Sequence, residues 1–106
     1  MLDRNHLRAL TEGDRDFERE LIDAYRQSAT DILKLLRVHV AAGDFDGVGR
    51  EAHALRGASL NVGATSVAKC CAEIEAAARA GDTHIAARLA ELETEERALW
   101  AELAQL

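Results

Sequence analysis

The residues best suited to chemistry in this sequence are its four histidines, because imidazole can act as a nucleophile near neutral pH. His6, His39 and His84 lie near expected helix ends, and we predict them to be ordinary surface or boundary residues. His53 differs. At 100° per residue, it points about 140° away from the apolar stripe of its own expected helix. Such a histidine is available to a reactant.

Glycines flank His53 on this outward face, with Gly49 one turn before it and Gly57 one turn after it. A glycine inside a helix lowers the stability of that helix by about 1 kcal/mol relative to alanine. Two glycines here therefore indicate that open space is needed on this face. Side chains lean toward the N-terminus of a helix, and the residue at position 57 therefore lies over the ring of His53. Gly57 is predicted to leave that ring open to a bulky reactant. The alternative is that Gly57 only allows close packing of helices.

Further residues extend the same face. Arg56 follows His53 by three positions, where its guanidinium can neutralise an anionic group held at the imidazole, with phosphoryl the obvious candidate. A solvated arginine without a role is the alternative. Leu60, two turns after His53, is a candidate apolar contact for a partner, and Gly49 and Arg50 are assigned to the same partner-binding face.

The sequence lacks the motifs of several other chemistries. It has no His-Glu-x-x-His, no Cys-x-x-Cys and no repeated Glu-x-x-His pair, so no metal centre is predicted. It also lacks the Gly-x-Ser-x-Gly elbow of hydrolases and the glycine-rich loops that bind nucleotide phosphates. We therefore expect no cofactor of its own.

The elements that position these residues are predicted to be helices. The chain has 106 residues, which is one domain (1–106), with Ala and Leu dominant and no proline. Three Gly-Asp pairs each combine a helix stop with the N-cap of the next helix. The expected helices run from Asp3 to Leu10, from Asp14 to Ala42, from the Asp44 cap to Asn61, from Thr65 to Ala80, and from Thr83 onward. We predict an all-α fold, an antiparallel up-down-up-down four-helix bundle with a short N-terminal lid helix.

Apolar spacing predicts the buried face of each helix. The expected core positions, in chain order, are Leu2, Leu7 and Leu10; Phe17, Leu21, Ala24, Tyr25, Ile32, Leu35 and Leu36; Val48, Ala52, Leu55, Ser59 and Val62; Val67, Cys71, Ile74 and Ala78; and Ile85, Leu89, Leu92, Leu99 and Leu103.

The net charge of −6 argues against nucleic acid as a partner. Cys70 and Cys71 are adjacent, so no disulfide framework is encoded and a reducing compartment is expected. The sequence shows no apolar run long enough for a membrane span and no signal peptide, which leads us to expect a cytoplasmic domain without membrane contact.

The residues around His53 resemble the signature of histidine-containing phosphotransfer (HPt) domains. That signature is Ala-His-x-Leu-Lys/Arg-Gly-x-Ser with a closing Gly-Ala, and the matching residues are Ala52, His53, Leu55, Arg56, Gly57, Ser59, Gly63 and Ala64. Cys71, Ile74 and Glu75 resemble the Cys-x-x-Leu-Glu of the following helix. The resemblance extends over nearly the whole chain.

The resemblance implies a phosphorelay intermediate, which accepts phosphoryl from a receiver-domain aspartate onto His53 and passes it to another receiver. Such a phosphocarrier is not an enzyme and has no autokinase activity, and the Mg²⁺ ion belongs to the receiver. Glu75 matches the position that meets the second ring nitrogen, where a carboxylate would orient the imidazole. Arg79 is assigned to docking, and the domain is expected to be a monomer.

Alternatives remain at this stage. A helical adaptor could keep the bundle and bind a signalling partner without chemistry. The dimerising domain of a sensor kinase would place an acidic residue after the histidine and a proline nearby, whereas Ala54 follows here and proline is absent. Glu75 could also be a solvated residue paired with Arg79, four positions on.

Overall fold

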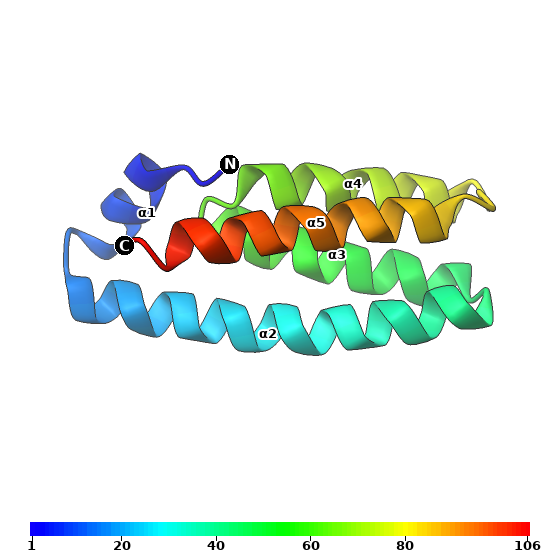
Figure 1. The fold of residues 1–106 in the computed structure, drawn as a ribbon, viewed down its shortest axis with the longest axis horizontal. Coiled ribbons are helices and arrows are strands. Elements are labelled where there is room, and N and C mark those ends of the chain that lie inside the picture. The colour runs from blue at the N-terminus through cyan, green and yellow to red at the C-terminus, as the bar shows by residue number, and fades with distance from the viewer.

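Five helices joined by short turns make up the computed structural model, which describes residues 1–106 (Figure 1). They are α1 (Arg4–Thr11), α2 (Arg15–Ala42), α3 (Phe45–Asn61), α4 (Thr65–Arg79) and α5 (Ile85–Leu103). Each helix begins within two residues of its predicted start. The prediction that Asp82 is the N-cap of the last helix is wrong, because His84 directly precedes α5 and Asp82 accepts from its backbone N–H instead. The aspartates before α2 and α3 act as predicted. Asp14 accepts from the backbone N–H groups of Asp16 and Phe17, and Asp44 accepts from that of Gly47. None of the helices has the length and apolar content that crossing a bilayer requires.

Helices α2 to α5 run along the 43 Å long axis and alternate in direction, and α5 returns beside α2 (Figure 1). The short α1 lies at the end of the bundle where both chain termini are found (Figure 1). The predicted all-α bundle with a short N-terminal helix is therefore confirmed. The pair of α3 and α4 shares the most extensive contact, so residues on these two helices can form one site.

The segment before α1 is held by the C-terminal part of α5 and by the α3–α4 turn. The backbone N–H of Leu2 donates to Glu102 of α5, and that of Asp3 donates to the carbonyl of Gly63 in the α3–α4 turn. Leu2 and Leu7 are buried as predicted, whereas Leu10 is 38% exposed and Thr11 is buried instead. Thr11 tolerates burial because its hydroxyl donates to the carbonyl of Leu7.

The predicted cores of α3, α4 and α5 are confirmed, since every residue named for them is buried. The prediction for α2 is wrong in part. Phe17 and Leu35 are 45% and 46% exposed and Ala24 is exposed, although Tyr25 and Leu36 are buried. The buried face consists of Ile22, Tyr25, Ala29, Leu33 and Leu36. This long helix carries apolar residues on two neighbouring faces, and contact with α3 and α5 selects between them.

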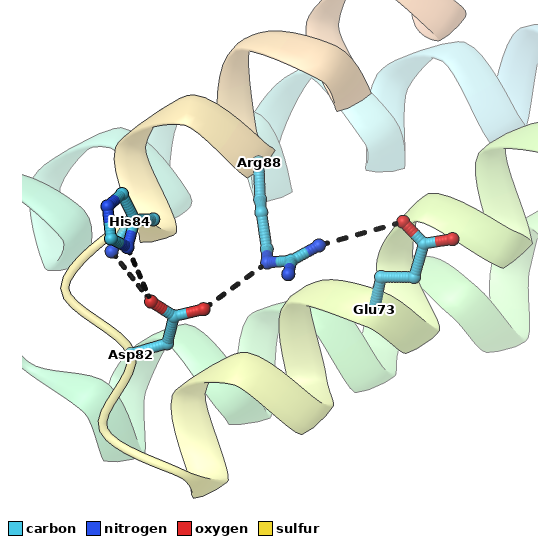
Figure 2. Close-up of polar contacts among 4 residues, drawn as sticks. All are labelled: Glu73, Asp82, His84 and Arg88. Atoms are coloured by element: carbon cyan, nitrogen blue, oxygen red, sulfur yellow. Dashed lines mark hydrogen bonds and ion pairs between the residues drawn. The ribbon is translucent and has the colours of Figure 1, made fainter.

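A cluster of charged side chains stabilises the turn between α4 and α5 (Figure 2). Asp82 accepts from the backbone N–H of His84 at 2.8 Å and forms an ion pair with Arg88 at 3.5 Å. Arg88 also approaches Glu73 of α4 at 3.9 Å, so the cluster joins the two helices (Figure 2). The hydrogen bond from His84 holds the pKa of the Asp82 carboxyl below its ordinary value.

Candidate functional site

His53 lies at the middle of α3 with its ring directed to solvent, and its side chain is 71% exposed. The neighbouring residues explain this orientation. Ala52 and Leu55 are fully buried against the core, which fixes the rotation of α3 and leaves position 53 on the outer face. The predicted outward direction of His53 is therefore confirmed.

The ring of His53 is held by Glu75 from the adjacent helix. Nδ1 lies 3.0 Å from Oε1 and 3.2 Å from Oε2 of the Glu75 carboxylate, and the Glu75 side chain is only 17% exposed. A carboxylate can only accept a hydrogen bond, so Nδ1 carries the proton and donates it. The lone pair of the neutral ring is then on Nε2.

Glu75 has a second partner on its own helix. Arg79 Nη2 lies 3.6 Å from Oε1, the same oxygen that accepts from His53. Glu75 therefore contacts both residues: the ion pair with Arg79 exists beside the contact to His53 and does not replace it. Because Arg79 is 76% exposed, its ion pair with Glu75 contributes little to stability.

An open groove of about 420 Å³ runs beside this pair between α3 and the C-terminal half of α4. Its lining residues are Phe45, Asp46, Gly49, Arg50, His53, Glu75, Ala78 and Arg79. A smaller hollow of about 150 Å³ is lined by Arg56 together with Glu75 and Arg79. Arg50, Arg56 and Arg79 thus gather around the His53–Glu75 pair in a chain of net charge −6. This arrangement favours an anionic group at the imidazole.

The two glycines near His53 have different surroundings. A Cβ atom added to Gly57 would meet no atom within 4 Å, so Gly57 does not serve close helix packing. One added to Gly49 would lie 3.9 Å from Cβ of Ala78, an ordinary contact at the edge of the groove. The space at Gly57 is therefore open to solvent on the face of His53.

Most residues assigned from the sequence line the two hollows, but Gly57 and Leu60 do not. Leu60 is 48% exposed on α3. Sequence reasoning missed Phe45, Asp46 and Ala78, which line the groove. Asp46 lies seven residues before His53, and this two-turn spacing is the signal that could have identified it.

Other reactive side chains do not join this site. Cys70 and Cys71 are free, and burial raises the pKa of the Cys71 thiol to about 12, which keeps it protonated and unreactive. No group of three or more His, Cys, Asp or Glu side chains is arranged to bind a metal ion.

Comparison with models of protein families identifies a related family. The model of a family described as the Hpt domain matches residues 20–106, which include α3, α4 and α5 and most of α2. No curated protein and no solved structure gives a significant match to the chain. The matched range contains both His53 and Glu75.

Proposed function

The chain belongs to the Hpt domain family, whose members carry phosphoryl groups on histidine in two-component signalling, and we propose on that premise that His53 is the phosphoacceptor. The observation that supports this assignment best is the exposed ring of His53 with its Nδ1 proton directed to Glu75. His84 is also exposed and lies 3.2 Å from the Asp82 carboxylate, which pairs with Arg88. His53 differs from it in the three arginines, Arg50, Arg56 and Arg79, that line the hollows beside its ring. We further propose that the domain is a relay intermediate between two receiver domains.

In the proposed reaction, the Nε2 lone pair of His53 attacks the phosphorus of an aspartyl phosphate on a receiver. The P–N bond forms, the P–O bond to the aspartate breaks, and the aspartate leaves as a carboxylate. The ring becomes a cation that retains its Nδ1 proton. Transfer to a second receiver is the reverse of this step, with that receiver's aspartate as the nucleophile.

Glu75 assists in two ways. By accepting the Nδ1 proton it keeps the Nε2 lone pair directed outward, and its negative charge stabilises the cation that forms on attack. Its partial burial makes this charge more effective than it would be in water.

The arginines and Gly57 are placed to help a receiver domain reach the ring of His53. Arg56 is placed to offset the charge of the incoming phosphoryl group, and Arg50 and Arg79 to contact the receiver along the groove. Leu60 offers this partner an apolar contact. The open space at Gly57 admits the receiver's active site to the ring. The receiver supplies the aspartyl phosphate and the Mg²⁺ ion that neutralises its charge. The domain itself uses no cofactor, performs no autophosphorylation, and functions as a cytoplasmic monomer.

Label transfer tests the proposal. The domain is incubated with phosphorylated receivers from its own organism, and acid-labile label on the domain is measured. The wild type and the His84→Gln control, which changes an exposed histidine on the α4–α5 turn, should accept label, whereas His53→Gln should not. Label on His53→Gln would contradict the assignment. Partner binding by the wild type without label from any receiver would support a helical adaptor instead.

A further inference from the structure

A buried carboxyl group lies inside the bundle, away from His53. Glu96 of α5 is 1% exposed and occupies the core stripe between Leu92 and Leu99. The Tyr25 hydroxyl donates to its Oε1 at 2.9 Å and lies 2.9 Å from the hydroxyl of Ser59. These hydrogen bonds connect α2, α3 and α5 in the interior.

The polar partners of the Glu96 carboxyl group are uncharged. Tyr25 faces it from α2, the Ser59 hydroxyl lies beyond on α3, and the buried Cys71 thiol is its titratable neighbour on α4. No arginine, lysine or histidine pairs with its carboxyl group, and its Oε2 is buried without a hydrogen-bond partner. An ionised carboxylate is costly in such a place, and the neutral acid costs much less.

We propose that Glu96 holds a proton in the folded domain and releases it to solvent on unfolding, which makes the bundle a pH-sensitive element that loses stability as the pH rises. This proposal does not depend on phosphotransfer at His53. Burial raises the pKa of Glu96 above its ordinary 4.5, and the hydrogen bond from Tyr25 opposes this rise only in part.

The direction of the pH effect follows from proton counting. Above pH 4.5 the unfolded chain has lost this proton while the folded domain still holds it, so raising the pH favours unfolding. The contribution of Glu96 raises the unfolding equilibrium constant by up to about tenfold per pH unit. The effect ends when the pH exceeds the pKa of Glu96 in the folded state.

Denaturant unfolding of the wild type and Glu96→Gln between pH 5 and 8 tests this proposal. The glutamine keeps an oxygen that accepts from Tyr25 but cannot ionise. The ratio of the two unfolding constants, wild type over variant, should rise with pH. The matched control is Glu91→Gln, an exposed glutamate on the same helix, whose ratio should stay constant. A constant ratio for Glu96→Gln as well would overturn the proposal.

A second measurement needs no variant. In the ¹³C-labelled wild-type domain, the side-chain carboxyl resonance of Glu96 is followed by NMR from pH 3 to 8. It should titrate above pH 4.5, the ordinary value for a glutamate. Titration of Glu96 at or below that value would show that it is ionised in the folded core and would overturn the proposal.

Discussion

Glu75 Oε1 lies 3.0 Å from Nδ1 of His53, so a carboxylate on α4 orients a ring on α3. The two helices form the most extensive contact of the bundle, and their buried residues fix the position of one relative to the other. The orientation of the ring therefore depends on the packing of the α3–α4 pair, and a ring held this way needs little rearrangement before the proposed reaction.

Replacing Glu75 should slow phosphotransfer without abolishing it. Glu75→Ala should reduce the transfer rate by about 10- to 100-fold, because His53 loses the group that orients its ring while Arg56 and the receiver's metal remain. Glu75→Gln should be less impaired, since its amide oxygen still accepts the Nδ1 proton. Rapid-quench measurement of transfer from a phosphorylated receiver gives both rates. Equal rates for the wild type and both variants would show that Glu75 has no orienting role.

A bulky residue in place of Gly57 should block transfer while the helix becomes more stable. Gly57→Leu should lower the transfer rate by about 100-fold or more, because the new side chain covers the ring of His53. Thermal unfolding should show a gain of about 0.5–1 kcal/mol from helix propensity. Ala86→Leu, at an exposed position of α5, is the control for added bulk and should transfer normally. Transfer by Gly57→Leu at the wild-type rate would contradict the role of the open space.

The helices and the outward direction of His53 could be predicted because both follow from local signals, the caps and the spacing of apolar residues. The rotation of α2 could not be predicted in the same way. Its Phe17 and Leu35 match a helical stripe as well as Ile22 and Leu33 do, and only the packing of α3 and α5 decides which stripe is buried. Contacts between helices, including the distance from Glu75 to His53, depend on packing that no local pattern contains.

Two glycines in the first turns of α3 should respond in opposite ways to alanine. At Gly47 an added Cβ would lie 2.5 Å from His39 Nδ1 and 2.6 Å from Asp44 Oδ2, so it would disturb the cap of α3. Gly49→Ala adds only an ordinary contact and should stabilise the domain by about 0.5–1 kcal/mol. Gly47→Ala should be less stable than Gly49→Ala by about 1–2 kcal/mol, because the His39 and Asp44 side chains must move and the cap is weakened. Denaturant unfolding measures this difference, and equal stabilities would refute the role of Gly47.

Acid should destabilise the domain partly through Asp82. The pKa of the Asp82 carboxyl is lowered in the folded state, mainly by the hydrogen bond from His84. Its contribution to the free energy of unfolding is therefore present above pH 3.8, and it is lost as the pH falls through the pKa of the folded state. The Asp82→Asn variant should therefore be less stable than the wild type at pH 7. Between pH 4 and 2 it should lose less stability than the wild type does. Asp23→Asn, an exposed aspartate on α2, is the control and should follow the wild type. Parallel curves for the wild type and Asp82→Asn would contradict this account.

The buried acid on α5 was missed because a glutamate is normally assigned to the surface. The spacing nevertheless contained a signal, since Leu89, Leu92, Leu99 and Leu103 leave one stripe position open and Glu96 fills it. Its partners Tyr25 and Ser59 were both predicted to be buried. A polar residue on an apolar stripe, with hydroxyl groups on the facing stripes, predicts such a network.

The atom that carries the phosphoryl group tests the account most directly. The ¹⁵N-labelled domain is phosphorylated by a receiver, and NMR coupling between ³¹P and the ring nitrogens locates the new bond. We predict a single phosphoryl group on Nε2 of His53, because Nδ1 is occupied by its hydrogen bond to Glu75. A phosphoryl group on Nδ1 of His53, or on any other residue, would contradict the account.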